Sequence, residues 1–257
     1  MTELATLTID GPVARITLNR AEQRNAMSVG LLEALHARMD DLEQAEGVVA
    51  TVLTGAGRAF CAGMDLKEIV VDESAGGSGD ATLPLRLLES LAKLTLRVRT
   101  LPSVTVAAVN GAAIGGGCGL ACVCDLAISH ADAKLGFPEV DLGLCPAVVA
   151  PWLVRKIGAG SARAVLLRGG VINGADAHRF GFVDHVAPNR DQLDSVTDKV
   201  VSRLATGGPT ALAVTKGLLN ELDGSLDENV VLRGAALSAE VVLSPSAQAI
   251  LSARLTN

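Results

Sequence analysis

The sequence predicts an α/β fold, with a mixed core over residues 1–190 and a helical C-terminal region over residues 191–257. Short apolar runs rich in β-branched residues, such as Val104–Val109, suit strands that are buried on both faces. Helical patterns alternate with these runs, and from Asp191 onward the pattern is helical throughout. Apolar residues make up 49% of the chain of 257 residues, which is enough for a large core. No internal repeat or sharp linker divides the two parts.

The first sixty residues predict three strands and one helix. Apolar positions in segments 4–9 and 13–18 flank an Asp-Gly pair, which predicts a β-hairpin. Ser28 is placed to cap a helix that runs to about Ala45, with its leucines on one face. Val48–Leu53 is a further strand, which a glycine-containing turn ends.

A tight turn and a polar excursion come next. Phe60–Leu66 predicts a turn that enters a short helix. Val71–Thr82 is rich in glycine and serine, and we expect a mobile excursion that is a candidate lid. Pro84 stands at a first helical position and predicts a helix to about Leu101.

The run Asn110–Gly119 is the centre of the chain, because it joins the strand Val104–Val109 to an apolar helix that stops at Asp125. The first N–H groups of a helix lack intrahelical partners, and the helix dipole favours negative charge there. Glycine adds no Cβ, so a ligand can approach the backbone closely. The run therefore predicts a turn whose main chain stabilises an anion.

Residues 101–124 carry no charge and are long enough to span a bilayer. However, Pro102, Asn110 and five glycines interrupt the segment, and no Trp or Tyr marks a membrane interface. A buried strand, turn and helix is the favoured interpretation.

The remaining elements are predicted as a strand, several helices and a second short strand. In chain order they are a strand at Asp125–Ser129, helices at Val148–Ile157 and Ser161–Arg168 with Gly158 between them, a turn at 172–174, a strand within 181–186, and three helices beyond Asp191.

Composition limits the possible partners. The net charge is −6 and the sequence pI is near 5.2, which argues against nucleic acid or an anionic membrane. An anionic ligand must therefore be held by a local basic cluster or by main-chain dipoles. The five cysteines form no C-x-x-C pair and no signal peptide is visible, so we expect reduced thiols and a cytoplasmic protein.

Several other site types are excluded by their spacing. The four histidines show no metal-ligand spacing, so no metal is expected. The chain has no G-x-S-x-G motif and no P-loop. The glycine run is not a dinucleotide fingerprint either, because Leu120 stands where G-x-G-x-x-G requires its last glycine.

Five motifs, in matching order and spacing, resemble those of the crotonase (enoyl-CoA hydratase/isomerase) superfamily over nearly the whole chain. They are FCAGMDLK at 60–67, AVNG at 108–111, GGGC at 115–118, CDL at 124–126 and PE at 138–139. The resemblance implies a crotonase-like spiral of ββα units and a C-terminal helical oligomerisation region. It also implies a homotrimer or a dimer of trimers, and an acyl-CoA thioester as substrate with no further cofactor.

In this family two main-chain N–H groups polarise the thioester carbonyl, and these positions fall on Met64 and Gly116. One such donor is typically worth roughly 3 kcal/mol of barrier. Glu139 matches the catalytic acid/base. Arg24 and Lys67 match basic positions near the CoA, while Arg20 either assists them or is a solvated surface charge. The same motifs place further residues against the substrate or CoA, namely Ala62, Gly63, Asp65, Leu66, Gly115 and Gly119.

The chain departs from the family at one catalytic position. Hydratases usually carry two glutamates that hold the added water, and the first of them falls here on Gly119. A single glutamate suits hydration or Δ3-Δ2 enoyl-CoA isomerisation, and losing the other could also leave a non-catalytic acyl-CoA-binding paralogue. The segment Leu142–Pro151 resembles a bacterial hydratase branch that takes branched or carboxylated enoyl-CoAs, such as methylglutaconyl-CoA, in leucine and isoprenoid breakdown. We therefore favour the hydratase. The dienoyl-CoA isomerase branch is discounted, since its Asp is replaced by Ala147.

Other polar residues near these motifs have ordinary structural interpretations. Asp141 is either a second carboxylate or, as we favour, a capping or solvated residue. Asp65 resembles a local helix cap and Asp125 a structural end to the apolar helix. Cys118 and Cys145 flank the predicted site, but no neighbour in the sequence would lower their pKa, so packing is their expected role.

Overall fold

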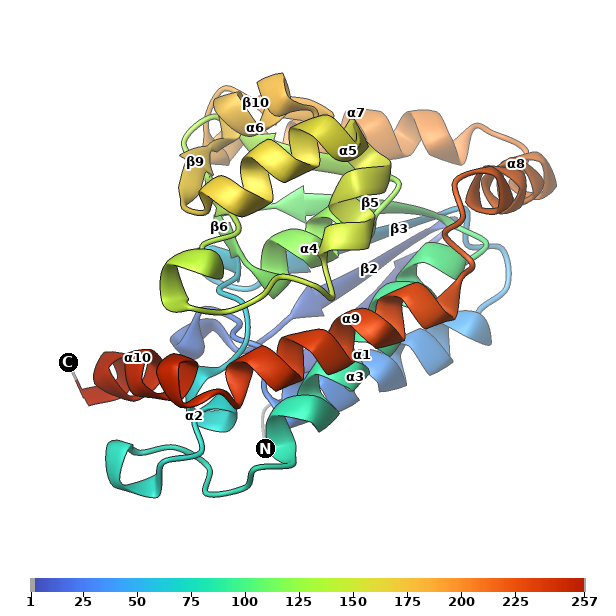
Figure 1. Ribbon diagram of the computed structural model, residues 1–257. Helices are drawn as coiled ribbons and strands as arrows, with labels where there is room; N and C mark the ends of the chain where they lie inside the picture. Colours follow the sequence, from blue (N-terminus) through green and yellow to red (C-terminus); the bar gives the residue numbers. More distant parts are fainter. Residues whose placement is uncertain (1–2, 257) are drawn as a thin grey trace.

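The computed structural model describes residues 3–256 and contains two β-sheets surrounded by helices (Figure 1). The larger sheet has six strands in the order β1-β2-β3-β5-β7-β10, with β1 and β2 antiparallel and the other neighbours parallel. Its strands are β1 (Ala5–Asp10), β2 (Val13–Leu18), β3 (Ala50–Gly55), β5 (Val104–Val109), β7 (Leu126–His130) and β10 (His185–Ala187).

The smaller sheet has four strands in the order β4-β6-β8-β9, and only its β8–β9 pair is antiparallel. Its strands are β4 (Ala59–Cys61), β6 (Ala112–Ile114), β8 (Lys134–Gly136) and β9 (Val171–Asn173). Strands β3, β5 and β7 of the larger sheet are each followed within a few residues by β4, β6 and β8 of the smaller one. Successive strand pairs therefore stack as turns of a spiral.

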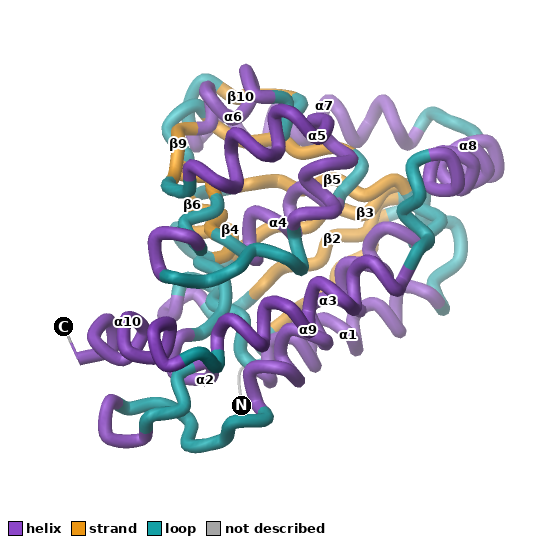
Figure 2. Tube along the Cα trace, viewed as in Figure 1, coloured by secondary structure: helices purple, strands orange, loops and turns teal. Residues whose placement is uncertain are grey.

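Ten helices cover the two sheets within residues 3–256. They are α1 (Val29–Glu43), α2 (Leu66–Ile69), α3 (Leu83–Thr100), α4 (Gly116–Val123), α5 (Ala150–Arg168), α6 (Gly174–Phe180), α7 (Leu193–Ala205), α8 (Pro209–Leu222), α9 (Glu228–Val242) and α10 (Pro245–Thr256). Figure 2 shows α1, α3 and α9 running beside one another along the orange strands. On another side of the larger sheet, α7 packs its Leu193 and Val201 against apolar side chains of β3, β5 and β7.

Most of the predicted elements are present. The Oγ of Ser28 caps α1 by accepting from the N–H of Leu31 at 3.2 Å. Gly158 breaks the helical geometry of α5 with φ 77° and ψ 156°, at the predicted boundary between two helices. The charge-free stretch forms β5, β6 and α4, whose residues are almost all buried. Val71–Thr82 contains a single 3₁₀ turn, Glu73–Ala75.

The interpretation of 172–174 as only a turn is wrong. These residues end β9 and start helix α6, which the sequence analysis did not include. The cause is a helix cap, because the Oδ1 of Asn173 accepts from the N–H of Asp176 at 2.8 Å. The predicted strand within 181–186 begins later, at His185.

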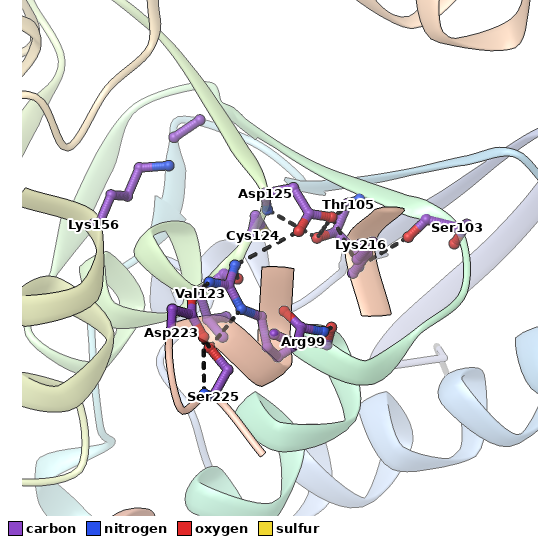
Figure 3. A network of polar contacts seen from close by, with 12 residues as sticks. Arg99, Ser103, Thr105, Val123, Cys124, Asp125, Lys156, Lys216, Asp223 and Ser225 are labelled. Carbon is purple, nitrogen blue, oxygen red and sulfur yellow. Dashed lines mark hydrogen bonds and ion pairs between the residues drawn. The ribbon is translucent and has the colours of Figure 1, made fainter. Parts of the chain in front are cut away.

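A partly buried ionic network, in which Lys216 is the buried cation, fastens α8 to the spiral (Figure 3). The Nζ of Lys216 lies 2.8 Å from Oδ2 of Asp125 and donates to the carbonyl of Ser103 at 2.9 Å. The same Asp125 oxygen accepts from both the N–H and the hydroxyl of Thr105, and Arg99 joins Asp125 to Asp223. Asp125 is therefore a structural residue, as expected from its place at the end of α4.

Between residues 3 and 256, no helix alone has the length and apolar character needed to cross a membrane. Helices α9 and α10 meet those criteria only when joined, and they are bent by 74°.

Candidate functional site

The spiral brings two glycine turns side by side. Strand β4 pairs in parallel with β6, so the segments that follow them, Gly63-Met64 and Gly115-Gly116, leave the sheet next to each other. A Cβ built on Gly63 would lie 2.9 Å from the carbonyl oxygen of Ile114 and 4.0 Å from the nitrogen of Gly116. Gly63 has φ +93° and Gly115 has φ +55°, which L side chains rarely adopt. Glycine is thus required here by both backbone angle and contact.

Among the described residues, the main-chain N–H groups of Met64 and Gly116 have no hydrogen-bond acceptor. Met64 forms a parallel bridge with Met27 through its neighbours, because Met27 donates to Gly63 and accepts from Asp65. The N–H of Met64 itself therefore points away from Met27. Gly116 is the first residue of α4, where helix N–H groups have no intrahelical acceptor. Among the hydrogen bonds of residues 3–256, neither N–H has an acceptor, and both residues line the same cavity.

Glu139 lies against this pair of turns. A Cβ added to Gly115 would be 2.7 Å from Oε1 of Glu139, so the absence of a side chain at Gly115 admits the carboxyl group. Its other oxygen, Oε2, is buried and has no hydrogen-bond partner among the described residues. Burial raises the pKa of Glu139 to about 7. A carboxyl group with this pKa can take up or release a proton near neutral pH.

The cavity that these groups share has a volume of about 110 Å³. Its walls come from the two glycine turns, α2, α3, the segment Pro138–Val149 and α9. Leu88 and Leu91 of α3 line it together with Leu144 and Val148, and most of the other lining side chains are also apolar. The arrangement can hold an apolar group next to two amide donors and one acid/base.

The position of the missing glutamate is closed by an apolar side chain. A Cβ added to Gly119 would be 2.1 Å from Cγ1 of Val149, so the isopropyl group of Val149 occupies the space above this glycine. Val149 is one of the described residues that line the cavity, and Gly119 is not. Val149 thus packs against Gly119, the residue that the resemblance places against the substrate.

The predicted basic residues near the CoA lie outside the cavity. Lys67 is exposed in α2, three residues past Met64. Arg24 is exposed, and its carbonyl accepts from the N–H of Ala62 at 3.0 Å, which ties it to the first glycine turn. Leu66 and Ala62 line the cavity. The two candidate CoA-binding residues are thus exposed and belong to segments joined to the first glycine turn.

Arg20 and Asp65 are engaged with each other. The Nη1 of Arg20 lies 2.6 Å from Oδ2 of Asp65 and also donates to the carbonyl of Ala26 at 2.9 Å. The other Asp65 oxygen caps α2 by accepting from the N–H of Lys67 at 3.1 Å. This supports the interpretation of Asp65 as a cap, and it means that Arg20 joins two loops rather than standing as a free surface charge.

The remaining candidates have structural surroundings. Asp141 accepts from the N–H of Gly170 at 2.8 Å, as a capping residue would. Cys118 is fully buried, and burial raises the pKa of its thiol. Cys145 lines the cavity, and burial raises its pKa too. No group of three or more His, Cys, Asp or Glu side chains within residues 3–256 could hold a metal ion.

Most of the apolar lining residues were not identified from the sequence, and two missed residues, Val149 and Ser238, matter for the shape of the cavity. Val149 has no local signal, because its role depends on contact with Gly119, thirty residues away. Ser238 of α9 is buried, donates to the carbonyl of Cys145 at 2.8 Å and accepts from the N–H of Ala147 at 3.2 Å. A single serine on the apolar face of a predicted helix was a signal that could have identified it.

Comparison with known proteins agrees with this geometry. The family described as enoyl-CoA hydratase/isomerase matches residues 8–237. A Thermus thermophilus protein named "Putative enoyl-CoA hydratase" is 40% identical over 214 residues, or 83% of each chain. The enoyl-CoA hydratase ACTT6 of Alternaria alternata is 34% identical and is covered to 78%, with 95% of this chain aligned.

Solved structures show the same fold. An enoyl-CoA hydratase from Bacillus halodurans superposes with a TM-score of 0.87 over 97% of this chain and 99% of its own, at 23% identity. The predicted crotonase-like architecture is thereby confirmed.

Proposed function

The chain belongs to the enoyl-CoA hydratase/isomerase family, and from this premise we propose that it adds water across the double bond of a 2-enoyl-CoA. The observation that carries the proposal is that three groups with unused hydrogen-bonding capacity border one cavity. The free N–H groups of Met64 and Gly116 and the unpartnered Oε2 of Glu139 belong to residues that line one apolar cavity. The names of the relatives at 34–40% identity support the same activity.

The two amides act on the thioester carbonyl. As water adds to the β-carbon, the π electrons move toward the carbonyl oxygen and form an enolate. Hydrogen bonds from Met64 and Gly116 stabilise this growing charge, and the N-terminal end of α4 adds its dipole. Main-chain donors suit this role because the neighbouring elements fix them before substrate arrives.

Glu139 acts as the general base and then as the general acid. Its carboxylate accepts a proton from water as the oxygen bonds to the β-carbon, and its carboxylic acid then returns a proton to the α-carbon as the enolate collapses. A pKa of about 7 makes both steps accessible near neutral pH. Because Val149 covers Gly119, this scheme uses Glu139 as the only carboxylate on the water.

The second candidate is Δ3-Δ2 enoyl-CoA isomerisation, which is favoured by the same closed position. An isomerase needs one base that moves a proton between two carbons and has no need of a held water. A third candidate is a non-catalytic acyl-CoA-binding paralogue.

One experiment separates the three candidates. Purified protein is given 2-enoyl-CoAs and 3-enoyl-CoAs, and thioester absorbance and product mass are followed, with the Glu139→Gln variant in parallel. A mass gain of one water from 2-enoyl-CoA supports the hydratase. Conversion of 3-enoyl to 2-enoyl without a mass change identifies the isomerase. Tight binding without turnover of any substrate overturns both enzymatic candidates.

The proposal extends to assembly and surroundings. An apolar strip on α8 is exposed, with Val214 at 66% and Leu222 at 75% exposure, and we assign it to contact with a neighbouring subunit in a homotrimer or a dimer of trimers. Light scattering of the purified protein tests this. We further propose a cytoplasmic enzyme that uses no bound cofactor, contributes to fatty-acid or branched-chain breakdown, and binds CoA through Arg24 and Lys67.

A further inference from the structure

Val149 forms a rigid part of the cavity wall. It is 2% exposed and precedes α5, and its carbonyl accepts from the N–H of Trp152 at 3.1 Å and of Leu153 at 3.2 Å. Its N–H donates to the carbonyl of Pro146 at 3.2 Å. A β-branched side chain on a backbone fixed at both ends has few accessible rotamers. The isopropyl group can thus hold one position between Gly119 and the cavity.

The segment that precedes Val149 is also held in place. Helix α9 approaches the segment before Val149 closely, because a Cβ on Gly234 would lie only 2.4 Å from the carbonyl oxygen of Ala147. Ser238, one turn later, bonds to Cys145 and Ala147. These contacts fix the main chain of the segment that carries Val148 and Val149 along the cavity, so the size of these side chains limits the space left for an acyl group.

The lining contains no basic side chain. Among the described residues around the cavity, only Glu139 is ionisable near neutral pH and Ser238 already uses its hydroxyl for main-chain partners. The free carboxylate of a dicarboxylic acyl-CoA would lose its hydrating water in this cavity without gaining a counter-ion. It would also lie near Glu139. The cavity therefore disfavours dicarboxylic acyl groups and accepts aliphatic ones.

We propose that Val149, resting on Gly119, is the specificity-determining residue of this cavity and restricts it to short, uncharged aliphatic acyl groups. This assignment rests on the proposed function for the identity of the ligand class. The resemblance allowed both branched and carboxylated acyl groups. The assignment keeps the uncharged acyl groups and excludes methylglutaconyl-CoA and related dicarboxylic substrates.

Binding of saturated acyl-CoAs tests the assignment without requiring turnover. Calorimetric titration of the wild-type protein with butyryl-, isovaleryl-, hexanoyl- and glutaryl-CoA compares each ligand with free CoA. We expect butyryl-CoA to bind at least about tenfold more tightly than glutaryl-CoA, since an unpaired buried charge is disfavoured. In Val149→Ala, we expect hexanoyl-CoA to gain about tenfold relative to butyryl-CoA, the size of a methylene-scale change in a hydrophobic pocket.

A double-mutant cycle separates the contact from general damage. Gly119→Ala places a methyl group against Val149 and should push the isopropyl group into the cavity, weakening butyryl-CoA binding about tenfold. Gly119→Ala combined with Val149→Ala should restore it. Gly160→Ala is the matched control, because a Cβ there meets no atom within 4 Å on an exposed part of α5. Thermal melts of all variants establish that each is folded.

Two results would overturn the assignment: equal affinity of the wild type for glutaryl- and butyryl-CoA, or an unchanged order of acyl affinities in Val149→Ala. The turnover assay tests the proposed function separately from the cavity assignment. If acyl selectivity follows Val149 but no enoyl-CoA reacts, the proposed function is wrong and the cavity assignment stands. If enoyl-CoAs react but the saturated acyl-CoAs bind without selectivity, the cavity assignment is wrong and the proposed function stands.

Discussion

Two acidic side chains in this protein have contrasting surroundings. Asp125 accepts hydrogen bonds from Thr105 and contacts the cations of Lys216 and Arg99 (Figure 3). Glu139 has a buried oxygen with no partner among the described residues, and apolar side chains make up most of its cavity. Both follow the glycine-rich centre of the chain, yet one is surrounded by donors and the other faces open space.

The difference in hydrogen-bond partners distinguishes a carboxylate that stabilises the fold from a carboxyl group that is left unpaired. A fully paired buried charge fixes the elements that supply its partners and is strongly destabilising to break. An unpaired carboxyl group weakens the fold whenever it is ionised, and burial raises its pKa to about 7. The contrast gives Asp125 a structural role and supports the proposed acid/base role of Glu139.

The largest expected effect comes from Glu139→Gln. This change keeps the size of the side chain but removes its ability to exchange a proton, and we expect kcat to fall about 10³-fold, within the usual range for general acid–base catalysis. Steady-state kinetics with 2-enoyl-CoA measure it. Asp141→Asn is the matched control, since among the described residues its carboxylate bonds only to the N–H of Gly170. A Glu139→Gln enzyme with wild-type kcat would remove Glu139 from the mechanism.

Lys216→Met tests the paired region. It leaves Asp125 with one cation at 3.6 Å, and we expect the free energy of unfolding to fall by about 3 kcal/mol while kcat of the folded protein is unchanged. Urea titration measures the loss. Adding Asp125→Asn should recover part of it, because the unpaired charge is then removed. Arg179→Met, which breaks an ion pair whose arginine side chain is 78% exposed, is the control and should change stability by less than ~0.5 kcal/mol.

The pH dependence of the free energy of unfolding tests the unpaired state of Glu139. The pKa of Glu139 is raised from 4.5 to about 7, so the folded state holds a proton that the unfolded state has released between these values. The stabilisation from this proton is complete below pH 4.5 and is lost as the pH rises through 7, about 3 kcal/mol in total. Glu139→Gln should lack this decline and be more stable than the wild type at pH 8. Urea titrations at pH 5 and 8 measure both proteins. A parallel decline in the variant would contradict the assignment to Glu139.

The local pattern of the sequence was sufficient for most elements. Ser28 as a helix cap, the break at Gly158 and the strand before Asn110 all depend on residues within a few positions of one another. The family resemblance implied which glycines, amides and glutamate belong to one site, and the parallel β4–β6 pairing explains why the two turns lie together. Their catalytic roles stay predictions that the kinetic variants test.

The remainder depends on contacts that no local pattern encodes. Val149 fills the space above Gly119, Arg20 pairs with Asp65, and Lys216 reaches Asp125 from ninety residues away. Each contact is decided by how helices and loops pack, and single residues such as a lysine in a predicted helix carry no sign of their partner. The missed helix α6 is different, because the cap at Asn173 was visible in the sequence and its meaning was not recognised.

The smallest expected effect concerns the contact that places Glu139. Gly115→Ala introduces a methyl group 2.7 Å from Oε1 and should displace the carboxyl group, lowering kcat about tenfold. Part of any stability loss comes from forcing an L residue to φ +55°, so Gly170→Ala is the matched control. It has φ +73° and no atom within 4 Å of the added Cβ. Stability should fall by ~1–2 kcal/mol in both variants, whereas kcat should fall only in Gly115→Ala. Because the control also places an L residue at positive φ, a selective loss of kcat reports the position of Glu139 itself. Equal kcat in the two variants would show that the carboxyl group needs no fixed place beside the amides.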